Sequence, residues 1–518
     1  MTDFDLLMMI GEAEDQYIMD SRRRPKKKPR RNTWVYALAA CLALAVIGGT
    51  GAMFLNRGGG NAAPKASELD MAVMENAAAE VPAEFGTEED AVMEEAEAAA
   101  QPAAEPAVIE GATLLAGAVY PESLDYEDFD GRSAVWTENQ TSDETKTALN
   151  SFAYAAAAKV LGGSPDSGCF SPLSLYQTLA VVTSGAGGET RDQLLSLLGQ
   201  SDLDTLADQA GKLYRVNYQD NAVNILRIAN SLWLDETDSL GAPVNYNMDW
   251  VIRASADYYA DVYAAEFDNA ETAEALGAWI AEKTGGMLHP SPETLGFDPN
   301  TVMAIVNTLW YKTQWAEKFD ETSTDQADFT TDAGQTVTCD FMHRTELGGQ
   351  AIVTDEYTKS SLYLERGRMI VVLPNEGVKV DDLLTEEKLW EIFENGDYEG
   401  ADVVWSVPKF ETGVTYRLED VLRELGVTDA FDPDAADFSA MSSETPLYVG
   451  QVQQGTHIAV NEDGVEAAAY TMAAMMAGEA APEELPTVEM NLNRPFIYLI
   501  TADDGSALFI GVVRDPSA

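Results

Sequence analysis

The stretch "EDGVEAAAYTMAAMMAGEAAPEELP", residues 462–486, decides how the rest of this sequence is interpreted. It is rich in Ala and Met, has one aromatic residue, Tyr470, and lies between two segments with the composition of β-strands. It is too long for a hairpin turn and too apolar for an ordinary exposed loop. A surface insertion without regular structure would explain the alanines, but not the ordered pattern of charge described below.

The composition limits the function classes that the chain can serve. Its 518 residues carry a formal net charge of −55, and phosphates repel a polyanion, so we expect no nucleic-acid partner. Three Cys and three His are scattered along the chain, without a CxxC, HExxH or GxSxG motif. The sequence therefore predicts no disulfide framework, no metal or cofactor site and no enzyme activity.

The N-terminal part predicts a membrane anchor. Residues 1–32 combine an amphipathic helical pattern with the basic run "RRRPKKKPRR", and residues 33–56 contain no charged residue. As a helix, Trp34 to Leu55 would span about 33 Å, enough for a bilayer core. Because Lys and Arg cluster only before this segment, we expect a cytoplasmic N-terminus and an extracellular body on a bacterial cell membrane.

Two other interpretations of this segment are a cleaved signal peptide and a lipoprotein, since "LAAC" resembles a lipoprotein cleavage box that ends at Cys41. The apolar run continues well past Cys41, which favours a retained transmembrane helix.

Residues 57–145 predict a disordered acidic linker, because Ala, Glu and Pro dominate its first half and aromatic residues are few. Within it, "DYEDFDGRSAVWTE" at 125–138 resembles a calcium loop only in part. Its first and last ligand positions would be Tyr126 and Thr137, so an acidic surface turn is the better interpretation.

The chain from 146 to 518 predicts one compact domain of the α+β class. Residues 148–161 have helical composition, and "RLEDVLRELGV" at 417–427 is an amphipathic helix that ends at a Gly. Short β-rich runs bounded by turn residues lie at 223–235, 302–312, 367–377, 401–411 and, as two strands around "DDGS", 494–516. No regular βα alternation and no internal repeat is present, so mixed sheets are expected.

Several blocks of this region, in order, resemble the serpin family over essentially its whole length. They are "FSPLSL" (170–175), "GAGGETRDQLLSLLG" (185–199), "ANSLW" (229–233), "WIAEKTGGML" (279–288), "VNTLWYKTQWAEKF" (306–319), "SVPKFE" (406–411), "LGVTDAFDPDAADFSAMS" (425–442), "NEDGVEAAA" (461–469) and "NRPFIYLI…ALFIGVV". The resemblance implies a serpin fold, with mixed central β-sheets, surrounding helices and an exposed reactive-centre loop.

The resemblance also implies a mechanism for the opening stretch. In the family, a protease cleaves the loop, forms a covalent acyl-enzyme, and is carried along as the loop inserts into the central sheet. The implied hinge comprises Glu462, Gly464, Val465, Glu466, Ala467, Ala468 and Ala469. Cleavage is expected in the window of Met475, Met476, Ala477 and Gly478, with the bond after Met476 preferred.

The charge pattern of the stretch suits insertion. Alternate residues of a strand face opposite sides of a sheet, and one alternate set is uncharged: Val465, Ala467, Ala469, Thr471, Ala473 and Met475. The acid Glu466 falls in the other set, where it can stay in solvent, and Gly464 supplies the bend at the start. This pattern favours an inhibitory member of the family over a non-inhibitory one.

The resemblance implies a polar cluster that holds the central sheet closed. Its expected members are Ser171, Asn307 and Gln454, where Gln454 replaces the His that the family commonly has ten residues before the hinge Gly. A Gln can still donate and accept hydrogen bonds, but it does not titrate.

Two hypotheses follow. The first is a monomeric, membrane-tethered, extracellular suicide inhibitor of elastase-, chymotrypsin- or subtilisin-like serine proteases, since no Lys or Arg lies between Glu462 and Met490. The second is a non-inhibitory serpin that acts as a surface binding or structural module. The physiological protease cannot be named from the sequence.

Overall fold

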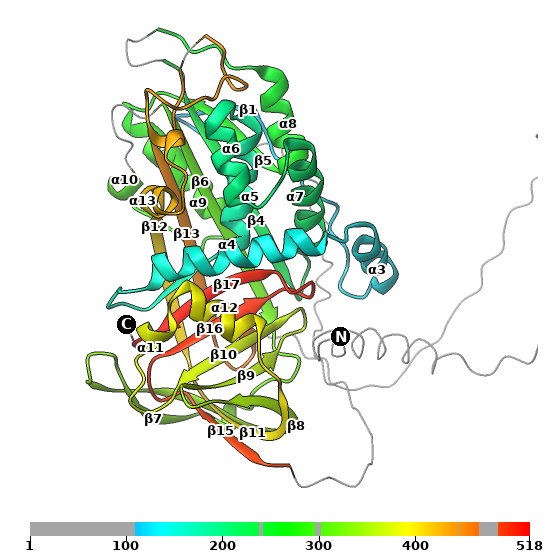
Figure 1. The fold of residues 1–518 in the computed structure, drawn as a ribbon, viewed down its shortest axis with the longest axis vertical. Coiled ribbons are helices and arrows are strands. Elements are labelled where there is room, and N and C mark those ends of the chain that lie inside the picture. The colour runs from blue at the N-terminus through cyan, green and yellow to red at the C-terminus, as the bar shows by residue number, and fades with distance from the viewer. Residues whose placement is uncertain (1–108, 238–241, 296–301, 445, 466–484, 518) are drawn as a thin grey trace, which may run out of the picture. The chain divides into compact units, whose positions relative to one another are not determined.

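The computed structural model describes residues 109–237, 242–295, 302–444, 446–465 and 485–517 (Figure 1). These residues form two β-sheets with helices packed around them, in agreement with the predicted α+β class. Among the described residues, no helix is long and apolar enough to cross a membrane. The predicted segments 1–32 and 33–56 lie outside the described residues, as do 57–108 of the predicted linker.

The first sheet has eight strands, in the order β1-β5-β4-β6-β14-β13-β12, with β3 paired to β4. Its strands are β1 (Thr113–Ala116), β3 (Gln219–Asp220), β4 (Ile225–Asp235), β5 (Ala260–Ala265), β6 (Met303–Gln314), β12 (Phe410–Arg417), β13 (Gln451–Val460) and β14 (Gly464–Val465). β4 and β6 pair antiparallel, whereas β6 and β13 pair parallel. The long strands β4 and β6 are buried along nearly their whole length, which explains their continuous apolar sequences.

The second sheet has nine strands, in the order β15-β11-β8-β9-β10-β16-β17-β2, with β7 paired to β8. Its strands are β2 (Gly168–Phe170), β7 (Asp325–Thr330), β8 (Thr336–Val353), β9 (Tyr357–Tyr363), β10 (Arg368–Pro374), β11 (Glu399–Pro408), β15 (Thr487–Asn491), β16 (Phe496–Thr501) and β17 (Ala507–Val513). The predicted C-terminal strand pair is therefore confirmed as β16 and β17. Residues 466–484 connect β14 of the first sheet to β15 of the second.

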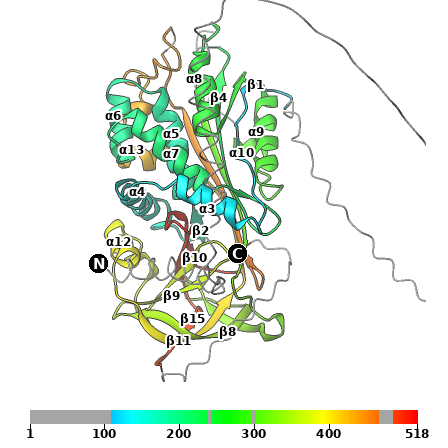
Figure 2. The ribbon, with the colours of Figure 1, turned by 90° about the vertical axis from the view of Figure 1, so that its right-hand side faces the viewer.

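Helices cover both faces of the first sheet (Figure 2). Most lie on one side around α5, which is buried along nearly its whole length, and α9 lies on the other side. The described helices are α3 (Phe129–Glu138), α4 (Asp143–Leu161), α5 (Pro172–Gly185), α6 (Gly188–Leu197), α7 (Leu203–Asn217), α8 (Met248–Tyr258), α9 (Ala270–Lys283), α10 (Pro292–Leu295), α11 (Val380–Leu383), α12 (Glu386–Glu394), α13 (Glu419–Glu424) and two 3₁₀ turns, Glu321–Ser323 and Asp429–Phe431. Beneath α9, Trp233 stacks on Tyr263 with ring centroids 4.6 Å apart and belongs to a separate apolar cluster.

The domain begins earlier than the sequence predicts. Strand β1 pairs antiparallel with β5 at the edge of the first sheet, so the predicted linker boundary at 145 is wrong for residues 109–145.

The predicted turn at 125–138 is also wrong over most of its length, because 129–138 form helix α3. The Asp128 side chain accepts a hydrogen bond from the Gly131 N–H and caps this helix, which accounts for the acidic residues before it.

The predicted single strand at 401–411 is divided between the two sheets. β11 ends at Pro408, and β12 begins at Phe410 in the other sheet. Proline has no N–H to donate to a ladder, which gives the chain a natural point to leave the second sheet. The predicted helix 417–427 is confirmed in its centre as α13, and Gly426 follows it with a φ of 99°.

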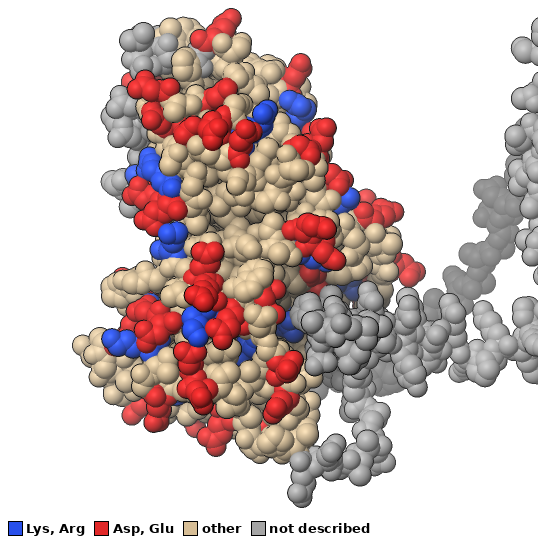
Figure 3. Space-filling model, viewed as in Figure 1, with Lys and Arg blue, Asp and Glu red and all other residues tan. Residues whose placement is uncertain are grey.

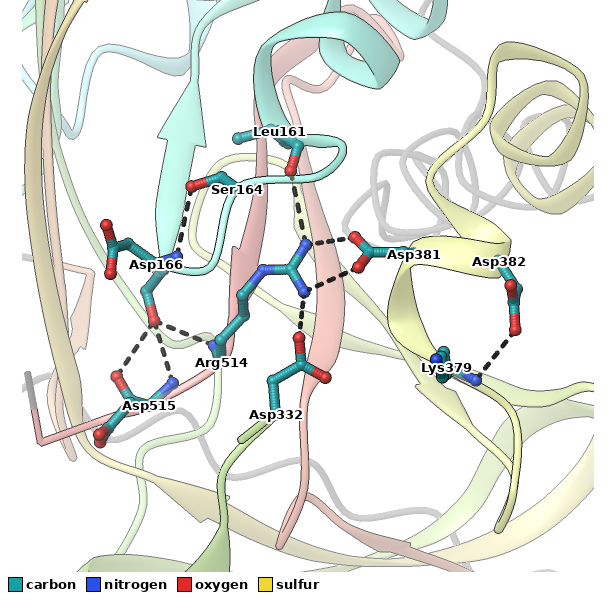
Figure 4. A network of polar contacts seen from close by, with 10 residues as sticks. Leu161, Ser164, Asp166, Asp332, Lys379, Asp381, Asp382, Arg514 and Asp515 are labelled. Atoms are coloured by element: carbon teal, nitrogen blue, oxygen red, sulfur yellow. Dashed lines mark hydrogen bonds and ion pairs between the residues drawn. The ribbon is translucent and has the colours of Figure 1, made fainter. Parts of the chain in front are cut away.

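A buried arginine holds the C-terminal end of β17 in place (Figure 4). The Arg514 side chain is 1% exposed and donates to Asp332 at 2.7 Å and to Asp381 of α11 at 2.5 Å. It also donates to the carbonyl of Leu161 at the end of α4, at 3.5 Å. Because both carboxylates converge on one guanidinium, the charge of this arginine is compensated inside the fold.

Candidate functional site

The opening stretch begins inside the first sheet. Strand β14 lies between β13 and β6, where Val465 is paired with Val460 on one side and with Thr313 on the other. At the opposite end, β6 and β13 pair directly with each other, from Ala304↔Gln451 to Thr308↔Gly455. The two central strands therefore separate toward one end, and β14 occupies the space between them.

Gly464 is the point of closest approach between β14 and β6. A Cβ atom at this position would lie 2.2 Å from the Thr313 carbonyl oxygen and 2.6 Å from the Gln314 Cα. Both are backbone atoms that cannot move aside without disturbing the strand. The predicted bend at Gly464 thus has a further structural requirement, because only glycine fits against β6 here.

Two acidic side chains before β14 are held by lysines. Glu462 forms an ion pair with Lys409 at 3.0 Å and accepts a hydrogen bond from Thr324 at 2.9 Å, while Asp463 pairs with Lys318 at 2.8 Å. Burial alone would raise the pKa of Glu462, but the hydrogen bonds from Lys409 and Thr324 outweigh it, so this pKa lies below its ordinary value. We call Glu462, Asp463 and their lysines the hinge anchor.

Backbone contacts fix the same turn. The N–H of Trp315 donates to the Asp463 carbonyl at 3.0 Å, and its indole N–H donates to the Asn461 carbonyl at 2.8 Å. The Phe319 N–H donates to the Glu462 carbonyl at 3.1 Å. Trp315 and the lysines were not predicted as site residues, because they come from separate segments and no local pattern joins them to the hinge. Asp463 was also missed, although it lies between the predicted residues Glu462 and Gly464.

The structure brings together the three residues of the predicted polar cluster. The Gln454 side chain accepts from the Ser171 N–H and donates to the Ser171 carbonyl, each at 2.9 Å. It also donates to the Asn307 Oδ1 at 3.2 Å, directly between β13 and β6. All three residues are at most 1% exposed. That the cluster keeps the sheet closed remains a prediction.

The polar cluster is larger than predicted. Ser174 of α5 donates to the Asn307 Oδ1 at 2.5 Å, and Asn307 donates to the Asn230 Oδ1 of β4 at 2.7 Å. Thr178, one turn further along α5, donates to the same Asn230 oxygen at 2.7 Å. The helical spacing of Ser174 and Thr178 signals one common face of α5, and this spacing alone could have indicated both residues.

The remaining predicted residues of the hinge and of the cleavage window lie outside the described residues. They are Glu466, Ala467, Ala468, Ala469, Met475, Met476, Ala477 and Gly478.

One histidine contacts both a serine and an aspartate. His343 lies 2.8 Å from the Ser406 Oγ and 3.1 Å from the Asp325 Oδ1, across β8, β11 and β7. Ser406 is paired in register with His343 of β8 on one side and with Asn491 of the edge strand β15 on the other. A backbone engaged in two ladders offers no free N–H groups for an oxyanion, so these contacts bridge strands. In the described part of the chain, no His, Cys, Asp and Glu side chains gather into a metal site.

The architecture defines a two-sheet protein with a segment that starts within a gap in one sheet and ends in the other. Comparison with known proteins agrees: residues 147–516 match the family model "Serpin (serine protease inhibitor)". The chain therefore belongs to the serpin family, a family of serine protease inhibitors and not of enzymes.

Similar proteins span nearly the whole length of this domain. Leukocyte elastase inhibitor A of Mus musculus is 28% identical, covering 67% of this chain and 92% of its own. Alpha-1-antiproteinase S of Cavia porcellus is 29% identical, covering 67% and 84%. Among solved structures, the native thermophilic serpin tengpin is 26% identical, with a TM-score of 0.62, covering 78% of this chain and 99% of its own.

Proposed function

We propose that the protein is a membrane-tethered, extracellular suicide inhibitor of serine proteases with small or medium-sized apolar specificity pockets. The observation that carries the proposal is the position of β14: the first residues of the loop lie between β13 and β6, where a longer strand could follow them. Cleavage of the loop would release the rest of this segment to insert behind Val465.

The register of β14 gives the path of that insertion. Continuing one residue at a time from Val465↔Thr313 and Val465↔Val460, Thr471 falls opposite Asn307 and Gln454. Met475 then falls opposite Met303, the first residue of β6. A full-length inserted strand therefore needs the chain up to Met475, which supports a cleaved bond after that residue, within the window 475–478.

Insertion requires the polar cluster to open. The inserted strand would pass between Asn307 and Gln454, whose side chains are now 3.2 Å apart. Val465 supports the inward orientation of the uncharged alternate set, since its side chain is fully buried. Thr471 belongs to the same set, so its hydroxyl would arrive at the cluster and replace part of the hydrogen bonding that is lost.

The target class rests on the residues around the cleaved bond. Met and Ala fit apolar pockets, and one similar protein is named leukocyte elastase inhibitor A. The tether rests on the uncharged segment 33–56 and its basic N-terminal flank, which support a single-pass anchor with the inhibitory domain outside the cell. We further propose that the protein acts as a monomer.

The test is incubation with elastase, chymotrypsin and subtilisin, with trypsin as the control protease. We expect a complex that survives SDS, a stoichiometry of inhibition near one for at least one of the first three, and cleavage between 475 and 478 by mass spectrometry. A chain that is only nicked, without a stable complex, would instead support the non-inhibitory alternative.

A further inference from the structure

A cavity lies where the N-terminal segment packs on the body of the domain. It has a volume of about 300 Å³. It is bounded by Pro121, Glu122 and Leu124, by helix α3 and Asn139, by the C-terminal end of α7, by Tyr218, Gln219 and Asn221, and by Arg366. The family match begins at residue 147, so α3 and the turn before it add one wall of this cavity from outside the matched region. The size is at the lower end of that of small-molecule sites.

Three arginines line the cavity: Arg132 of α3, Arg215 of α7 and Arg366. Arg366 forms an ion pair with Asp503 at 2.7 Å. Among the described residues, neither Arg132 nor Arg215 has a carboxylate within 4.0 Å.

The two unpaired guanidinium groups have only neutral partners. Arg132 donates to the Tyr126 carbonyl, and Arg215 donates to the Asn139 Oδ1 at 2.7 Å and to the Tyr259 hydroxyl at 3.0 Å. These partners orient the side chains, and neither guanidinium forms a direct ion pair with a described carboxylate. Burial, and next the nearby charge of Arg366, lowers the pKa of Arg132 and outweighs the opposite effect of the more distant carboxylates of Asp503 and Asp128.

The acidic side chains that line the cavity do not neutralise the charge of its arginines. Glu122 and Glu138 also line it, but both are exposed, so water screens their charges, whereas the three arginines are partly buried. On the face shown in Figure 3, acidic side chains are more widespread than basic ones. Unpaired basic groups in a cavity are therefore unusual in a chain with a net charge of −55.

The apolar part of the lining includes Leu124, Val135, Trp136 and Val216, and the amides of Asn139, Gln219 and Asn221 add neutral polar groups. A ligand that fits must combine an acidic group with an apolar body. A water-sized group occupies about 30 Å³, so the cavity holds roughly ten non-hydrogen atoms.

We propose that this cavity binds a small amphiphilic carboxylate, with its acidic group held by Arg132 and Arg215 and its apolar body against Trp136 and Val216. Such a ligand would bridge α3 to α7 and so stabilise the docking of the N-terminal segment on the domain. The site is independent of the loop, and its existence does not depend on whether the protein inhibits a protease. The test below distinguishes an aliphatic acid from an aromatic one.

The test is calorimetric titration of the full chain with octanoate and with 3-phenylpropionate, using 1-octanol and 3-phenyl-1-propanol as neutral matches. We expect one of the two acids to bind with a stoichiometry near one and to raise the midpoint of thermal unfolding. The corresponding alcohol should bind at least tenfold more weakly. Comparison of the two acids identifies the preferred apolar body.

Variants assign the binding to the cavity. Arg132→Gln and Arg215→Gln should each weaken the acid at least tenfold, whereas Arg253→Gln, which removes the same charge from an exposed position on α8, should leave the affinity unchanged. Arg132→Lys and Arg215→Lys retain the charge and should keep most of the affinity, even if a Gln variant folds poorly. Absence of binding by both acids, or equal affinity in the parent and all variants, would overturn the proposal.

Discussion

The polar cluster, between β6 and β13, and the hinge anchor, at the turn before β14, use different chemistry. In the polar cluster, Ser171, Asn307 and Gln454 are uncharged, almost fully buried and joined by side-chain and backbone hydrogen bonds. In the hinge anchor, Glu462 and Asp463 form ion pairs with lysines that are 38% and 30% exposed. Of the two, only the hinge anchor should make a contribution to stability that depends on pH and salt.

The difference follows from where each region must open. The hinge anchor lies at the end where β14 already separates the central strands, so solvent reaches it and ion pairs there are weak. The polar cluster lies where β6 and β13 still pair directly, and any group left without a partner there would be buried. The cluster should therefore contribute more to the resistance against insertion than the hinge anchor does.

The largest effect is expected for a charge at the start of the inserted strand. Val465→Glu would place a carboxylate at a position that is already fully buried in the intact protein, at a cost of about 3–5 kcal/mol for an uncompensated buried charge. The intact variant should therefore unfold at a lower temperature than the intact parent, which differential scanning calorimetry measures. Val465→Ala is the matched control and should lose less, because it introduces no charge. An intact Val465→Glu variant as heat-resistant as the parent would contradict the burial of this residue between β6 and β13.

The next effect concerns the polar cluster. Gln454→Leu would leave the Ser171 N–H without its acceptor inside the fold, which costs about 1–3 kcal/mol. Chemical unfolding of the intact protein measures this loss. The neighbouring Gln453→Leu is the control, because Gln453 is equally buried but its Oε1 has no hydrogen-bond partner among the described residues. Equal losses in both variants would show that Gln454 contributes only packing.

Much of the fold was predictable because its strands are long and apolar. β6 and β4 are covered on both faces, and such burial leaves a continuous apolar run that is recognisable in the sequence. β1 was not predictable, since its four residues become a strand only by pairing with β5, which lies far along the chain. Helix α3 was missed because its cap, Asp128, belongs to the same acidic run that resembled a turn.

The candidate site was predictable only where the family resemblance pointed to it. Ser171, Asn307 and Gln454 come from three distant segments, and the resemblance named all three. Asn230 and the lysines of the hinge anchor were missed, because their roles depend on tertiary contacts that no local sequence pattern indicates. A buried network is specified by the fold as a whole, whereas a strand is largely specified by its own residues.

A smaller effect is expected from acid at the hinge anchor. The pKa of Glu462 is lower in the folded protein than its ordinary 4.5, so its stabilising contribution is complete above that value. It is lost as the pH falls below 4.5 and through the folded pKa. Glu462→Gln should remove this dependence and cost about 1 kcal/mol at pH 7, as is typical of a partly exposed ion pair. Unfolding free energies at pH 7 and pH 3.5 measure it, and an identical pH dependence in parent and variant would contradict the assignment.

The smallest expected effect distinguishes the intact form of the protein from the nicked form. If Thr471 arrives between Asn307 and Gln454 on insertion, Thr471→Val should destabilise the nicked form by about 0.5–1.5 kcal/mol, the worth of one hydrogen bond, and leave the intact form unchanged. Valine has nearly the same shape, so packing in the inserted strand is preserved. Thr336→Val, a substitution of the same type at an exposed position on β8 of the second sheet, is the control and should not distinguish the two forms. A loss in the intact protein would mean that Thr471 already contacts the body before cleavage, and no loss in either form would place another residue of the loop at the polar cluster.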